Sequence, residues 1–117
     1  MTPTTKYVVG FAFTPTLASV VLIRKNKPAW QAGKLNGVGG KIEPGEEPAN
    51  AMAREFLEEA GVSTSPADWR QFCTMVGAGL PDKGAFSVDC FYSVGVSLLE
   101  LRSCTAERVD RFYVDTI

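Results

Sequence analysis

The chain has no histidine among its 117 residues, and this absence removes several classes of enzyme. A Ser-His-Asp triad, an HExxH zinc site and a Glu-x-x-His di-iron site all need an imidazole. Any acid–base chemistry must therefore come from carboxylates, lysine, tyrosine, cysteine or a metal-bound water molecule.

Cysteine is scarce as well. Cys73, Cys90 and Cys104 are odd in number and lack the paired spacing of a metal site. We expect buried thiols in a reduced compartment, and hence a cytoplasmic location, in preference to a disulfide framework.

Long apolar runs and basic runs are also missing. No apolar stretch reaches the ~20 residues that span a bilayer, and the start "MTPTTKYVVGFAF" lacks the long apolar region of a signal peptide. The net charge is -1, and no cluster of lysine and arginine forms a basic stripe. We therefore expect neither a membrane nor double-stranded nucleic acid as a partner.

What is present fits one domain over residues 1–117, with 45% hydrophobic residues to form a core. Runs rich in β-branched and aromatic residues predict strands at residues 6–13, 18–25, 69–79, 85–96 and 110–117. The sequence "LPDKG", residues 80–84, is typical of a hairpin loop. A single helix lies between the early and late strands, so the prediction is a mixed α+β fold with the helix packed on a sheet.

The helix is predicted over residues 48–60. Pro44-Gly45 suits a type II turn before it, and Pro48 suits the first helical position. Gly61 suits the left-handed residue that ends a helix. Two apolar rows repeat every four residues, one of Met52, Phe56 and Ala60 and the other of Ala49, Ala53 and Leu57.

Three glutamates, Glu55, Glu58 and Glu59, share the opposite face at i, i+3 and i+4. Residues 40–62 carry a surplus of four negative charges in a chain whose net charge is only -1. A solvated polar face is one interpretation, and Arg54 with Glu58 is then an ordinary i, i+4 pair. The other is a site for a hard divalent cation such as Mg²⁺, Mn²⁺ or Ca²⁺, which relieves the repulsion.

The segment before the helix, "GKLNGVGGKI", is rich in glycine but matches neither a Walker A motif nor GxGxxG. A flexible loop or tight bend is one interpretation. Its position directly before the acidic helix supports another, in which glycine backbone groups approach a ligand or metal closely.

Together these residues match the Nudix box, G-x5-E-x7-R-E-U-x-E-E-x-G-U with U bulky and apolar, over residues 40–62. The nine matching positions are Gly40, Glu46, Arg54, Glu55, Phe56, Glu58, Glu59, Gly61 and Val62. The chain thus resembles the Nudix hydrolase superfamily, and in particular MutT-like nucleotide pyrophosphohydrolases. The resemblance implies the Nudix fold, an α/β/α sandwich on a mixed sheet.

The resemblance also implies Mg²⁺-dependent hydrolysis, with Mn²⁺ as an alternative ion, of a nucleoside diphosphate linked to another group. By position, Glu55, Glu58 and Glu59 correspond to catalytic metal-binding glutamates, and the carbonyl of Gly39 corresponds to a backbone ligand. Arg54 and Glu46 correspond to a pair that orients the catalytic helix. We expect the substrate to be bound by Asn36, Gly39, Gly40 and Lys41.

Substrate choice depends on residues outside the box. The segment "KLNGVGGK" resembles that of Nudix enzymes that hydrolyse oxidised purine triphosphates, where an Asn at the position of Asn36 contacts the base; Asn36 could equally be a turn residue. Trp30 could stack on a base or cover the core. Glu107 could be the additional glutamate that many members supply from a later loop, or a surface acid.

The usual C-terminal helix of the family is not evident before Ile117. An uncovered apolar sheet face would be a liability, so we expect a homodimer. The function expected is hydrolysis of a (deoxy)nucleoside triphosphate, with an oxidised purine among the candidates. The alternative is a non-catalytic Nudix-fold module that senses nucleotides or binds a protein, although such modules tend to lose the glutamates that this chain retains.

Overall fold

Seven strands form the sheet of the computed structural model, which describes residues 5–27, 29–78 and 84–116, without the side chains of Trp30 and Thr116. The strands are β1 (Thr5–Phe13), β2 (Ser19–Arg24), β3 (Leu35–Asn36), β4 (Val38–Lys41), β5 (Arg70–Gly77), β6 (Phe86–Val94) and β7 (Arg108–Tyr113). The helix α1 spans Pro48–Ala60, and short 3-10 turns occur at η1 (Ala29–Gln31), η2 (Pro66–Asp68) and η3 (Val114–Thr116).

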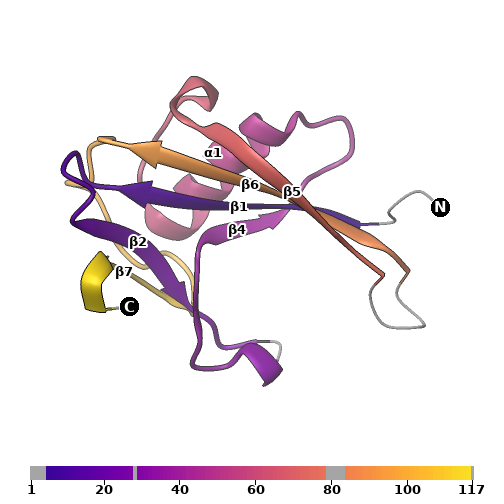
Figure 1. Ribbon diagram of the computed structural model, residues 1–117, viewed down its shortest axis with the longest axis horizontal. Helices are drawn as coiled ribbons and strands as arrows, with labels where there is room; N and C mark the ends of the chain where they lie inside the picture. Colours follow the sequence, from indigo (N-terminus) through magenta and orange to yellow (C-terminus); the bar gives the residue numbers. More distant parts are fainter. Residues whose placement is uncertain (1–4, 28, 79–83, 117) are drawn as a thin grey trace.

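Strand β1 organises the sheet (Figure 1). On one edge it runs parallel to β6 along its full length, and β5 pairs antiparallel with the far side of β6. On its other edge β4 pairs with residues 7–10 and β2 with residues 12–13, both antiparallel. Strand β2 continues to β3 and β7. The predicted mixed sheet is confirmed, whereas residues 80–83 of the predicted hairpin loop lie outside the described chain.

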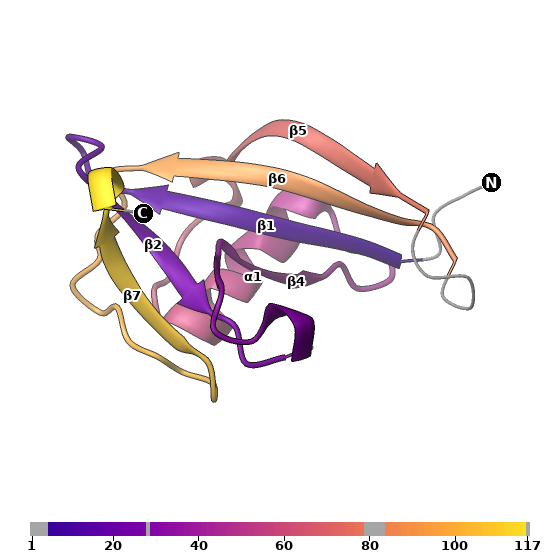
Figure 2. The same ribbon diagram turned by 60° about the horizontal axis from the view of Figure 1, so that its bottom comes forward.

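Helix α1 has the predicted boundaries. Gly45 and Gly61 both have positive φ, 78° and 73°, so each takes the conformation that its position in the turn and at the helix end requires. Figure 2 shows α1 behind the layer formed by β1, β6 and β5. In the described residues it is the only α-helix, so one helical layer of the expected sandwich is seen.

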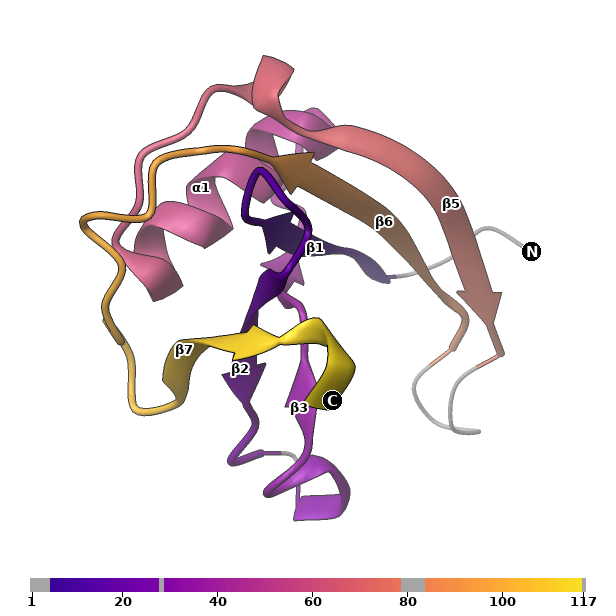
Figure 3. The same cartoon turned by 60° about the vertical axis from the view of Figure 1, so that its left-hand side comes forward.

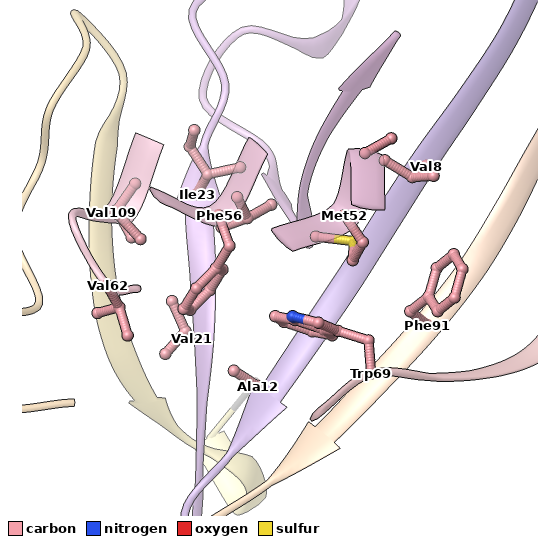
Figure 4. Close-up of a cluster of buried hydrophobic side chains, with 13 residues drawn as sticks. Val8, Ala12, Val21, Ile23, Met52, Phe56, Val62, Trp69, Phe91 and Val109 are labelled. Atoms are coloured by element: carbon pink, nitrogen blue, oxygen red, sulfur yellow. The ribbon is translucent and has the colours of Figure 1, made fainter. Parts of the chain in front are cut away.

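The core lies between α1 and the sheet (Figure 4). Phe56 and Met52 are fully buried, and the Phe56 ring meets the Trp69 ring edge-on at a centroid distance of 5.1 Å. The second apolar row is covered less completely than predicted, because Leu57 is 49% exposed. Its neighbours Ala49 and Ala53 pack only at the margin of the core, so the row lies at the edge of the contact with the sheet.

The prediction of buried thiols holds only for Cys90, which is 3% exposed. Cys73 and Cys104 are exposed; Cys73 lies on β5, an edge strand whose residues are exposed from Arg70 to Val76. The cytoplasmic location inferred from the cysteines stays a prediction. Within the described chain, no helix has the length and apolar character needed to cross a membrane.

Candidate active site

Arg54, on the second turn of α1, is the centre of a charge network. Its Nε donates to Glu46 Oε2 at 2.8 Å and its Nη2 donates to Glu46 Oε1 at 3.0 Å, so the guanidinium grips the carboxylate at two points. The Lys41 carbonyl accepts from Nη2 at 2.9 Å. These bonds tie α1 to the end of β4 and to the turn before the helix, as expected of a pair that orients the helix.

The same network affects the acidity of its members. The hydrogen bond from Arg54 holds the pKa of Glu46 below its usual value, and the bond to Glu46 raises the pKa of Arg54. Glu46 Oε1 also accepts from the Glu43 N–H at 3.0 Å, which closes the turn. Glu46 therefore carries a negative charge, and its carboxylate is turned toward Arg54.

Two of the three helical glutamates also contact Arg54. Its Nη1 donates to Glu55 Oε2 at 2.8 Å and to Glu58 Oε2 at 3.1 Å, the latter being the predicted i, i+4 pair. The Glu55 side chain is 12% exposed, whereas that of Glu58 is 54% exposed. Burial raises the pKa of Glu55 even though Arg54 opposes this shift.

Gly40 lets the Glu55 carboxylate approach β4. A Cβ atom at residue 40 would lie 2.5 Å from the carboxyl carbon of Glu55, far closer than real contacts allow. The preceding glycine is more tightly constrained, because a Cβ at Gly39 would lie 2.0 Å from the Val8 backbone carbonyl oxygen. The glycines before the helix therefore make space for an acid and for a neighbouring strand.

Glu59 is the most unusual acid in the cluster. Its Oε2 is buried and has no hydrogen-bond partner in the described structure. Burial, followed by the charge of Glu55, raises the pKa of Glu59 to about 7, although a backbone hydrogen bond from Gly39 and the charge of Lys25 act against the shift. Burying a carboxylate oxygen without a hydrogen-bond partner destabilises the folded state. Binding of a cation or a proton by Glu59 would remove this destabilisation.

A solvated polar face, one of the two interpretations of the three glutamates, does not describe two of them. Only Glu58 is exposed, while Glu55 and Glu59 are partly buried. The physical reason is that α1 packs on β4, where the Glu55 carboxylate lies against Gly40 and Glu59 is hydrogen-bonded by the Gly39 backbone. The spacing of the glutamates predicted that they share one face of the helix, but it did not predict which part of the fold that face contacts.

These residues fit a hard divalent cation. The donors are carboxylate oxygens, and one of them, Glu59 Oε2, is already desolvated and unpartnered. In the part of the chain that is described, no group of three or more acidic or thiol side chains is placed to hold a metal ion by itself. Arg54 engages both Glu55 and Glu58. Mg²⁺ does not need such a cage, since it keeps several waters and shares its coordination with phosphates.

The residues expected to bind the substrate are spread over β3 and β4. Asn36 is exposed on β3, and its Oδ1 accepts from the Gly37 N–H at 2.8 Å, which supports the turn interpretation for that oxygen. Lys41 is exposed at the end of β4. Gly39 and Gly40 lie on β4, and the side chain of Trp30 lies outside the described structure.

Sequence reasoning did not single out Lys25. Its Nζ pairs with Glu107 Oε1 at 3.0 Å, and both charges act on the pKa of Glu59. Glu107 is not an ordinary surface acid, because its side chain is only 13% exposed. The available signal was the cluster of four cations at Arg24, Lys25, Lys27 and Lys34, with no acid between them.

Comparison with curated proteins finds short similarities. The chain is 46% identical over 43 residues to an oxidized purine nucleoside triphosphate hydrolase of Danio rerio, covering 37% of this chain and 28% of that protein. It is 43% identical over 44 residues to the 8-oxo-dGTP diphosphatase of Escherichia coli (strain K12), covering 38% and 34% respectively. The matches thus span about a third or less of these relatives.

Solved structures share the fold over nearly the whole chain. A MutT/nudix family protein from Enterococcus faecalis superposes with a TM-score of 0.79 at 18% identity, covering 97% of this chain and 44% of that one. A Nudix hydrolase from Nitrosomonas europaea gives 0.75 at 23% identity, covering 98% and 75%. The family model of the NUDIX domain matches residues 4–95, which is well over half of the chain. The chain therefore belongs to the Nudix domain family.

Proposed function

We propose that the protein is a Mg²⁺-dependent nucleotide pyrophosphohydrolase acting on a (deoxy)nucleoside triphosphate, with oxidised purine nucleotides among its candidate substrates. The observation that carries the proposal is the buried, unpartnered Oε2 of Glu59 beside the partly buried Glu55. A solvated polar face would leave neither acid desolvated. The short similarities to enzymes named for oxidised purine nucleotides and 8-oxo-dGTP support the substrate class.

Glu55, Glu58 and Glu59, with the carbonyl of Gly39, would hold Mg²⁺, with Mn²⁺ as an alternative ion. When bound, it would polarise a phosphorus–oxygen bond and lower the pKa of an attacking water molecule. Arg54 would keep the helix and its carboxylates in place through its fork on Glu46. Asn36, Gly40 and Lys41 would bind the nucleotide from the adjoining segment.

Partial burial of Glu55 and Glu59 has a consequence for binding. Water is largely kept from these carboxylates, so their attraction for a cation is stronger than that of exposed acids. Glu58, which is 54% exposed, would contribute less and could turn between Arg54 and the ion. We therefore expect Glu59 to matter most, Glu55 next and Glu58 least.

The direct test is a panel of nucleoside triphosphates, dinucleoside polyphosphates and nucleotide sugars incubated with Mg²⁺, with products identified by mass. We expect a nucleotide and pyrophosphate from at least one triphosphate. Glu59→Gln should lower kcat by about a hundredfold or more, while Glu100→Gln, an exposed acid outside the cluster, should not. Full activity of Glu59→Gln would contradict the assignment, and nucleotide binding without turnover would favour the non-catalytic module.

Self-association as a homodimer stays a prediction. Strand β5 offers exposed apolar side chains, with Phe72 and Met75 each 54% exposed and Val76 71% exposed. Sedimentation over a range of concentrations should detect the dimer, and Val76→Lys should weaken it. A monomer at every concentration would contradict the prediction.

A further inference from the structure

The connection between β2 and β3 carries charge opposite in sign to that of the acidic helix. Residues 24–34 contain four cations and no acid, whereas residues 40–62 carry a surplus of four negative charges. Backbone bonds from the Lys25 N–H to the Lys34 carbonyl, 2.9 Å, and from the Gly33 N–H to the Lys25 carbonyl, 2.8 Å, close this connection. Arg24 Nη1 also donates to the Gly33 carbonyl at 2.8 Å.

Glu107, just before β7, holds the start of this connection. Its Oε2 accepts from the Asn26 N–H at 2.6 Å and from the Lys27 N–H at 3.3 Å. Its Oε1 accepts from Lys25 Nζ at 3.0 Å, and Asn26 Nδ2 donates to the neighbouring Ala106 carbonyl at 3.0 Å. One carboxylate thus joins three consecutive residues across about 80 positions of sequence.

The sheet brings these residues to the site. Arg24 pairs with Arg108, so the end of β2 lies beside the start of β7 (Figure 3). The Cys104 N–H donates to the Glu59 carbonyl at 3.0 Å, so the segment that leads to Glu107 passes along the end of α1 that carries Glu59. Through its pairing with Glu107, three residues further along the chain, Lys25 is placed toward the same end of α1.

We infer that Glu107 is a positioning residue that fixes Lys25 and the start of the β2–β3 connection beside Glu59, where Lys25 meets the phosphate chain of a ligand. The inference rests on the proposed function for the ligand class. The acids alone repel a polyphosphate, whereas a fixed ammonium beside them attracts it. Without a partner, Lys25 would lose side-chain conformational entropy each time it binds a ligand. Its ion pair with Glu107 reduces this loss.

The contacts of Glu107 argue against a role as the proton acceptor in the reaction. Both oxygens already accept hydrogen bonds, and its side chain is 13% exposed. A general base must reach the proton that it removes and should have a pKa near the working pH. Burial by itself would raise the pKa of Glu107, but Asn26, Lys25 and Lys27 together hold it below its usual value.

The first test measures the contact itself. Hydrogen exchange followed by mass spectrometry should show faster exchange at the amides of Asn26 and Lys27 in Glu107→Ala, by about tenfold, with α1 unchanged. Glu100→Ala, which removes an exposed acid, is the matched control and should exchange as wild type does. Unchanged exchange at Asn26 and Lys27 would overturn the inference.

The second test separates positioning from proton transfer. With the triphosphate that is cleaved best, Glu107→Gln and Lys25→Met should each raise KM by about tenfold, keep kcat within about threefold and preserve the pH profile. The double variant should be no worse than Lys25→Met alone, because Glu107 acts through Lys25. A fall in kcat of about a hundredfold with an unchanged KM and a lost limb of the pH profile would make Glu107 a proton acceptor instead.

The two proposals fail in different ways. If the wild type hydrolyses nothing in the panel, the proposed function falls, and the inference is decided by hydrogen exchange and by calorimetric binding of pyrophosphate with Mg²⁺. Binding should weaken by about tenfold in Glu107→Gln and Lys25→Met but not in Glu100→Gln. Equal affinity in all four proteins would overturn the role of Lys25.

Discussion

Two rows of α1 meet the same sheet with opposite consequences. The row of Met52 and Phe56 is fully buried against apolar side chains, so it stabilises the fold. The row of Glu55 and Glu59 is partly buried against the glycines of β4, where one acidic oxygen has no hydrogen-bond partner among the described residues. One helix thus carries both apolar side chains that stabilise the domain and a desolvated acid that destabilises it.

The largest effect should come from the apolar row. Phe56→Ala removes a fully buried ring that packs on Trp69, so unfolding free energy should fall by about 3–5 kcal/mol. Leu57→Ala, at the next and half-exposed position, should cost less than about 1 kcal/mol. Denaturant unfolding measures both, and similar losses would mean that the two positions are not packed as described.

The next effect separates the two adjacent glycines of β4. Gly39→Ala would drive a methyl group into the Val8 backbone carbonyl, so it should cost about 3 kcal/mol or more. Gly40→Ala meets only the flexible end of Glu55, so it should cost less than about 1 kcal/mol and instead displace that carboxylate. Gly40→Ala should therefore unfold almost as wild type does while losing most hydrolysis. Equal losses of stability in the two variants would contradict the different surroundings assigned to Gly39 and Gly40.

A smaller effect on stability should come from the acidic row of Glu55 and Glu59. Here a substitution should raise the unfolding free energy instead of lowering it. The pKa of Glu59 is about 7 in the folded protein, above its ordinary value of 4.5, so the folded state binds the proton more tightly. Protonation of Glu59 therefore stabilises the folded state fully below about pH 4.5, and this stabilisation is lost as the pH rises through about 7. Without metal, Glu59→Gln should therefore be more stable than wild type by about 1–2 kcal/mol near pH 8.

The pH dependence provides the control for that prediction. The difference between Glu59→Gln and wild type should shrink as the pH is lowered toward about 5, because Glu59 is then protonated in the fold. Glu58→Gln changes an exposed acid and should show no comparable gain. Denaturant unfolding with a chelator at several pH values measures all three proteins, and a gain that is independent of pH would contradict the assigned cause.

The smallest effect should come from Mg²⁺ itself. Because Arg54 already engages Glu55 and Glu58, we expect the ion to raise the melting temperature of the wild type only slightly without nucleotide, and more with it. Glu59→Gln should lose most of both increases. Thermal unfolding with and without a slowly hydrolysed nucleotide measures the difference, and no increase under either condition would favour a metal-free module.

Much of the local structure was accessible from residue types and spacing. Pro48 and Gly61 predicted the ends of α1, and the spacing of Arg54 and Glu58 predicted their ion pair. The match to the box predicted the contact of Glu46 with Arg54, eight residues apart. Helical geometry alone brings Arg54 and Glu58 together, because residues i and i+4 lie on one face. The contact of Glu46 with Arg54 was implied by the resemblance to the family and not by helical spacing.

Other features required contacts between distant segments. The exposure of Cys73 follows from the place of β5 at the edge of the sheet, and the pairing of Lys25 with Glu107 follows from the pairing of β2 with β7. Neither could be predicted from local spacing. The two interpretations of Asn36 also remained open, because the choice depends on its surroundings and not on its neighbours in sequence.

The residue order of the chain was enough to specify a capped helix with an apolar row and an acidic row, because helical periodicity assigns side chains to faces. It did not specify that Glu55 and Glu59 would turn toward Gly39 and Gly40 while Glu58 stayed in solvent. Only the packing of α1 across β1 and β4 decided this. Desolvation depends on what covers a side chain, and at this site the cover comes from another part of the fold.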